Sequence, residues 1–111
     1  MRTYVADRRK QERTVLVLEE FEGKHYAKPL KHFEQHSPDG FEWGYAGSGP
    51  ADLALALCAD ALGAVDPALE VYQEFKFLVV AGLPWAEWTM EQQYVLDVIG
   101  QIRKQAAEAS R

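Results

Sequence analysis

The sequence has one cysteine, no long apolar run and few basic residues away from its two ends. The single cysteine, Cys58, excludes an internal disulfide bond and suits a reducing compartment. No run approaches the roughly 18 apolar residues that a membrane-spanning helix needs. The N-terminal stretch also lacks the apolar centre of a secretory signal. These absences lead us to expect a cytoplasmic protein without a transmembrane helix.

Basic residues are scarce in the middle of the chain. The net charge of −5 divides into +3 for residues 1–32, −10 for residues 33–100 and +2 for residues 101–111. Within the middle stretch Lys76 is the only Lys or Arg. Such an acidic body disfavours broad contact with nucleic acid phosphates and suits a partner with a basic surface. The same charge would also keep a protein without such a partner soluble.

Runs of β-branched and aliphatic residues predict strands in the first part of the chain. Thr3–Arg8 and Thr14–Glu20 have this composition and are joined by a polar link of hairpin length. Phe41–Tyr45 alternates aromatic with other residues, as a half-buried strand does. Val15–Leu18 is apolar throughout, which predicts a strand that is central or covered on both faces. For residues 24–39, a short helix and an extended stretch both remain open.

Three helices are predicted in the rest of the chain, and turn residues mark their ends. The first spans about 50–62, and the second runs from Asp66 to about Ala81. The third opens at Thr89 with the capping-box pattern Thr-Met-Glu-Gln. The 111 residues therefore form a single α+β domain, in which about three helices pack on a small antiparallel sheet of about three strands. Its two parts are residues 1–48, mainly strands and loops, and residues 49–108, mainly helices.

The segment His36–Leu57, HSPDGFEWGYAGSGPADLALAL, resembles the core of a family of small domains of unknown function from bacteria, plasmids and phages. That core reads approximately H-S-P-x-G-F-x-W-G-Y-x-G-S-G-P-A-x-L-A-L-A. Tyr72–Lys76 and the pair Trp88-Thr89 match later segments of the family, whereas Ala46 stands where glycine is commoner. The resemblance supports the fold and implies a mobile-element context. It implies no activity.

The three glycines of Gly44–Gly49 could cradle a phosphate or could turn the chain into a helix. Phosphate loops use several backbone N–H groups at a helix N-terminus, and Pro50 removes one of them. No Gly-Lys-Ser/Thr motif follows, the spacing is not the dinucleotide fingerprint, and Asp52 would repel an anion. We therefore favour a structural role, in which the loop reverses the chain against Trp43 and Tyr45.

Several polar residues could together form a catalytic or ligand-binding pocket. Catalysis would need a base such as His36 in hydrogen-bond contact with a hydroxyl such as that of Ser48. The sequence spacing demonstrates no such contact. Lys76 lies between two phenylalanines and should seek a carboxylate, because burying it unpaired is costly. The candidate carboxylates are Asp52, Asp60 and Glu42. The possible pocket comprises His36, Trp43, Tyr45, Ser48, Asp52 and Lys76.

Metal binding has a weak signal. His25, His32 and His36 could act together with Glu34 or Asp39. However, the second and third of these histidines share a face only if their segment is helical. Zinc sites usually contain pairs of cysteine and histidine residues, and with a single cysteine in this chain the signal is weak. We therefore expect no metal and no cofactor.

The leading hypothesis is a non-enzymatic protein-interaction module of phage or mobile-element type. Its acidic face and an aromatic anchor would bind a basic partner, such as a host defence nuclease that it could inhibit. The partner-binding residues would be Glu70, Glu74, Glu87, Trp85 and Trp88. One alternative is a small enzyme or ligand-binding protein that uses the pocket residues. The other, which the charge makes less favourable, is nucleic acid binding through the basic loop Arg8-Arg9-Lys10…Arg13.

Overall fold

The first three strands are neighbours both in sequence and in space. The computed structural model describes residues 1–9 and 14–110. In it, β1 (Arg2–Asp7) pairs with β2 (Val15–Phe21), and β2 pairs with β3 (Lys24–Pro29). Both pairs are antiparallel, so this part of the chain forms a meander.

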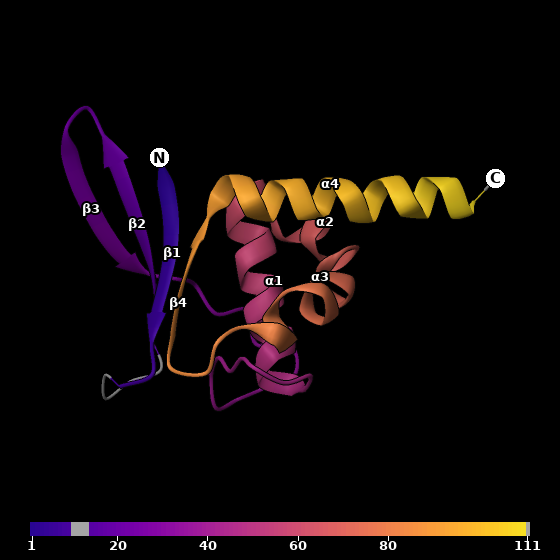
Figure 1. The fold of residues 1–111 in the computed structure, drawn as a ribbon, viewed down its shortest axis with the longest axis horizontal. Helices are drawn as coiled ribbons and strands as arrows, with labels where there is room; N and C mark the ends of the chain where they lie inside the picture. Colours follow the sequence, from indigo (N-terminus) through magenta and orange to yellow (C-terminus); the bar gives the residue numbers. More distant parts are fainter. Residues whose placement is uncertain (10–13, 111) are drawn as a thin grey trace.

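The fourth strand comes from far along the chain. It is β4 (Glu87–Glu91), and it pairs antiparallel with the other side of β1. The strand order is therefore β3-β2-β1-β4, with β1 and β2 in the centre and β3 and β4 at the edges (Figure 1). The prediction that the apolar strand after the first loop is central is confirmed.

The helices lie together on one side of the sheet (Figure 1). They are α1 (Ser48–Leu62), α2 (Val65–Leu69), α3 (Tyr72–Leu78), the short 3-10 turn η1 (Val80–Gly82) and α4 (Gln92–Ala109). Helix α1 stands between the sheet and the pair α2 and α3, whereas α4 follows directly from β4 and extends away from the sheet. The other face of the sheet carries no helix of the described chain.

Helix α1 is the centre of the hydrophobic core. Twelve of its fifteen residues are buried, as its nearly continuous apolar sequence predicts. Tyr4 and Val17 on the inner face of the sheet belong to the same buried cluster as Leu53, Phe75 and Ile99 from the helices. The expected α+β fold is confirmed, with four strands and four α-helices in the described residues where about three of each were expected.

The predicted strand at Phe41–Tyr45 is wrong, because these residues form a loop. Phe41 and Trp43 are nevertheless buried, so their alternation marks side chains that enter the core from an irregular segment. The third strand is β3 instead. All six of its residues are exposed, and therefore no apolar alternation announces it. The stretch 30–36 is irregular rather than helical.

Two predictions about the helices are also wrong. The helix expected over 66–81 is interrupted, first at Val71 between α2 and α3 and then before η1. The last helix begins at Gln92 rather than Thr89, because the backbone of Thr89 belongs to β4 and pairs with β1. Glu91 is the N-cap residue, and its side chain makes no capping hydrogen bond. The expected capping box is therefore absent.

The glycine-rich loop turns the chain tightly into α1. Gly44 has a φ of 86°, in the left-handed region that favours glycine. Gly49, in the first turn of α1, is buried against Glu42. A Cβ atom at Gly49 would lie 2.7 Å from the Cβ atom of Glu42 and 3.2 Å from its backbone nitrogen. Close packing therefore requires a glycine at this position.

We expect Gly49→Ala to lower the free energy of unfolding by about 1–3 kcal/mol, because the added methyl group overpacks the loop. Gly100→Ala on α4 is the matched control, because a Cβ atom there meets nothing within 4 Å. In a helix interior that change should stabilise the fold by about 0.5–1 kcal/mol. Urea denaturation of both variants measures the difference. Equal effects of the two substitutions would contradict the close contact at Gly49.

Candidate functional site

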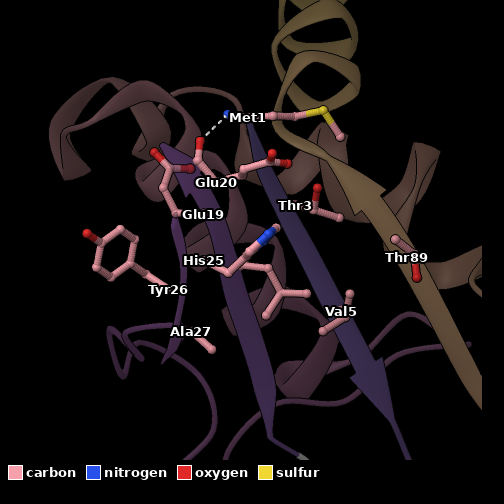
Figure 2. Close-up of a pocket in the computed structure, with 10 residues that line it drawn as sticks. Met1, Thr3, Val5, Glu19, Glu20, His25, Tyr26, Ala27 and Thr89 are labelled. Carbon is pink, nitrogen blue, oxygen red and sulfur yellow. Dashed lines mark hydrogen bonds between the residues drawn. The ribbon is translucent and has the colours of Figure 1, made fainter. Parts of the chain in front are cut away.

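The face of the sheet that points away from the helices, which we call the outer face, carries apolar side chains. The strand register places Thr3 opposite Leu18, and Leu18 opposite Ala27 on β3. Likewise, Val5 lies opposite Leu16. Figure 2 shows this side of the sheet, with the helices behind the strands. A hollow of about 360 Å³ lies over Thr3, Val5, Leu18 and Ala27. Leu18 is 37% exposed.

Acidic side chains border this apolar area. Alternation along the strands places Glu20 of β2 and both Glu87 and Glu91 of β4 on the outer face. The guanidinium of Arg9 bridges Glu87, at 2.8 Å, and Asp7, at 3.0 Å. Among the described residues, these carboxylates outnumber the two positive groups beside them, the guanidinium of Arg9 and the N-terminal ammonium, which donates to the C=O of Glu20.

The inner and outer faces of β2 differ in how far they are covered. Val15 and Val17 point toward the helices and are fully buried, whereas Leu16 and Leu18 point outward and remain partly accessible. The sequence signal for this surface was the apolar run Val15–Leu18. On its own, that signal could not distinguish a face covered by the chain itself from one left for a partner.

Asp52 is fully buried in the first turns of α1, and its carboxylate fastens the irregular segment 32–37 to this helix. It accepts a hydrogen bond from Nε2 of His32 at 2.7 Å. It also accepts bonds from the backbone N–H groups of His36 and Ser37, each at 3.0 Å, and of Gln35 at 3.3 Å. One carboxylate thus provides the acceptors for three consecutive backbone donors.

Burial and hydrogen bonding act on the pKa of Asp52 in opposite directions. Burial raises the pKa by penalising the charged carboxylate. The hydrogen bonds from His32 and from the backbone of Ser37, Gln35 and His36 together lower it by a larger amount. The pKa therefore lies below its usual value. A carboxyl with a lowered folded-state pKa stabilises the fold above its unfolded pKa of about 4. That contribution is lost as the pH falls through the folded-state pKa.

The pair of His32 and Asp52 has the form of a base and its orienting carboxylate, as in hydrolases. In the described residues, however, the hydrogen bond of the His32 ring is the one to Asp52, and no hydroxyl group bonds to it. Its ring packs on Phe41 at a centroid distance of 4.8 Å. The geometry supports a role in fixing the loop.

The structure divides the residues of the predicted pocket among several places. Asp52 bonds to the backbone of His36, whose ring instead meets Tyr72 at 2.8 Å and is exposed. Tyr45 and Ser48 line a hollow of about 430 Å³ that is bordered by neither Lys76, His36 nor Asp52. Trp43 lies in the core.

Lys76 forms no ion pair with any residue in the described ranges. Its ammonium lies 4.2 Å from the ring centroid of its neighbour Phe77. The three carboxylates that it was expected to seek bind other groups instead. Asp52 binds His32, Asp60 binds Tyr4 and Arg2, and Glu42 binds Arg8.

Arg8 joins the end of β1 to two loops. Its guanidinium lies 3.5 Å from the ring centroid of Trp85, donates to the C=O of Trp85 at 2.9 Å and forms a bidentate pair with Glu42. Trp43 donates its indole N–H to the same carbonyl at 3.0 Å. Trp88 is buried against Trp43 in an edge-to-face contact. Of the two proposed tryptophan anchors, Trp85 is the exposed one, at 59%.

The three glutamates of the predicted acidic face lie on different elements. Glu70 follows α2, and Glu74 lies in the first turn of α3. Glu87 lies on β4, and no Cα atom of this strand comes within 8 Å of one in α2 or α3. The structure therefore does not gather Glu87 with the other two.

The structure describes only part of the proposed basic loop, and it bears on the metal hypothesis only for the described residues. Arg8 and Arg9 are both ion-paired within the fold, while Lys10 and Arg13 lie outside the described residues. In the described ranges, no three His, Cys, Asp or Glu residues form a group that could hold a metal ion. Cys58 is buried, and burial raises the pKa of its thiol to about 12, as for a packing residue.

The fold and its surfaces define a small α+β domain with one open sheet face. Residues 4–101 match the model of DUF6166, a family of unknown function, and the chain belongs to this family. No curated protein and no solved structure matches the chain significantly. Across residues 1–9 and 14–110, no helix has both the length and the apolar character to cross a membrane.

We expect Asp52→Asn to lower the free energy of unfolding at pH 7 by about 3 kcal/mol, because the new NH₂ group opposes buried donors and the charge is lost. Asp66→Asn, at an exposed position on α2, should change it by less than about 0.5 kcal/mol. The difference between wild type and Asp52→Asn should narrow as the pH falls below about 4. Thermal denaturation between pH 2.5 and 7 tests this, and a difference independent of pH would contradict it.

Proposed function

We propose that this protein is a non-enzymatic protein-binding module that binds its partner through the outer face of the sheet. The observation that carries the proposal is the uncovered apolar area around Leu18 and Val5, opposite the face that packs on the helices. Isolated apolar residues on a surface are ordinary. A contiguous apolar area with a polar border is typical of a binding surface.

The charges around this area support a partner of defined chemistry. Glu20 and Glu91 border the apolar centre, and the whole chain has a net charge of −5. A partner that buries Leu18 therefore needs apolar side chains flanked by lysine or arginine. Opposite charges would also speed association and make it sensitive to salt.

The polar clusters elsewhere in the chain favour binding over catalysis. The carboxylate of Asp52 is occupied in holding segment 32–37, and the bidentate pair of Arg8 and Glu42 holds loops together. The burial of these charged groups is explained by the hydrogen bonds and ion pairs with which they hold the loops. A host defence nuclease is one partner with the required basic surface, since it must hold nucleic acid. We propose it as the first partner class to test, in a mobile-element context.

We expect Leu18→Asp to reduce capture of the partner by more than about tenfold, because it places a charge in the centre of the apolar area. Leu69→Asp on α2 is the matched control, since Leu69 has a similar exposure of 42% but lies on the helical side. Affinity capture from host lysate, followed by mass spectrometry, measures both. Capture that both substitutions reduce equally, or that neither affects, would contradict binding through the outer face.

Two double variants that neutralise acidic residues distinguish binding through the outer face from binding through the helical surface. We expect Glu20→Gln with Glu91→Gln to weaken capture by about tenfold at low salt, and less at 0.5 M salt. Glu70→Gln with Glu74→Gln removes the same charge from the helical side and should have little effect. If the Glu70 and Glu74 variant lost more capture than the Glu20 and Glu91 variant, the binding surface would be on α2 and α3 instead.

A further inference from the structure

We propose that the open edge of β4 binds an extended peptide segment of a partner protein, which adds a fifth strand to the sheet. A hollow of about 510 Å³ lies beside this edge. It is bordered by Thr89 and Glu91 of β4, by Leu78 and Leu83 of the segment around α3 and η1, and by Tyr94 of α4. This groove adjoins the outer face at Thr89, but the inference rests on the backbone edge of β4 and not on the proposed function.

Among the described residues, no backbone or side-chain group bonds to the outward backbone groups of β4 at this edge. On its other side, the N–H of Arg8 donates to the C=O of Ala86 at 2.7 Å, at the start of the ladder between β1 and β4. Bonding residues alternate along an antiparallel ladder, so the N–H and C=O groups of Thr89 face away from β1. The N–H of Glu91 does the same. Strand addition uses such groups.

The backbone of β4 is separated from α3 and η1. Neighbouring strands lie about 4.8 Å apart. No Cα atom of β4 comes within 8 Å of a Cα atom of α3 or η1. The backbones of α3 and η1 therefore lie farther from β4 than one strand spacing.

Apolar side chains at the groove would contact every second residue of an added strand. Leu78 is 59% exposed and Tyr94 is 49% exposed, and Leu83 is partly buried and packs against the core. In the single helix expected from Asp66 to about Ala81, the three- and four-residue spacing of apolar residues predicts that Leu78 is buried. The break after α3 leaves it at the groove instead.

The two edges of the sheet differ in their protection against pairing. Lys24, Lys28 and Pro29 lie on β3, and such residues discourage the addition of a strand. The sequence of β4 is EWTME, which has neither lysine nor proline. Glu91, which borders the groove, instead favours basic residues on an added strand, whereas Glu87 is already paired with Arg9. The occupant is therefore an extended segment in which apolar and basic residues alternate.

The test is a titration of the isotope-labelled full chain with the synthetic peptide Ac-Lys-Val-Lys-Val-Lys-Val-NH₂, followed by amide NMR. We expect saturable shifts at the N–H groups of Thr89 and Glu91 and slower hydrogen exchange at both. The same peptide with alternate amides N-methylated keeps its side chains but cannot pair on its methylated side. It should bind at least about tenfold more weakly, as should Ac-Glu-Val-Glu-Val-Glu-Val-NH₂. Absent shifts, or equal binding of the N-methylated peptide, would overturn the proposal.

Two neighbouring residues on α3 provide matched variants. Leu78→Asp should weaken binding of the lysine peptide by at least about tenfold. Phe77→Asp, at a position that is 62% exposed and does not line the groove, should leave it unchanged. Shifts at Thr89 that grow with protein concentration alone would show that a second copy of the chain occupies the edge. That result would overturn the proposed partner, as would equal effects of the two variants.

Discussion

A buried carboxylate, Asp52, makes this arrangement of sheet and helices possible. The segment that leads from β3 to α1 has no regular structure and is largely exposed, yet Phe41 and Trp43 insert their side chains into the core. Its backbone donors at Gln35, His36 and Ser37, of which Ser37 is buried, need an acceptor, and that acceptor comes from α1. The carboxylate supplies that acceptor, and the pair of Arg8 and Glu42 then ties the same segment to the end of β1. With α1 fixed in this way, the helices occupy one side of the sheet.

Because the helices lie on one side of the sheet, no described helix covers its outer face. The outward residues of β2 are as apolar as the inward ones, but only the inward ones are packed on α1. The interruption of the second helix has a similar consequence, since it leaves Leu78 exposed beside the open edge of β4. The two surfaces meet at Thr89, which borders both hollows. A partner that covered the outer face would therefore also lie next to the edge of β4.

Sequence reasoning found the features that depend on local patterns. The apolar run of α1, its glycine stop and the first two strands were predicted because each has its own composition. It missed β3, which is exposed throughout, and β4, whose residues also satisfy a helix-capping pattern. It placed Asp52 as a first-turn acid or a pocket residue, because its partners lie 15 to 20 positions earlier. The apolar run Val15–Leu18 predicts a strand that is central or covered on both faces. It does not reveal the open face, because composition alone does not show what lies above a strand.

The central claim is that the outer face is uncovered in the free protein. The most direct measurement is methyl NMR of the full chain with a soluble paramagnetic probe, which broadens signals according to their distance from solvent. We expect the methyl groups of Leu18 to be broadened strongly and those of Val17, on the opposite face of the same strand, to be spared. Equal protection of Leu18 and Val17 would show that the outer face is covered in solution and would contradict this account.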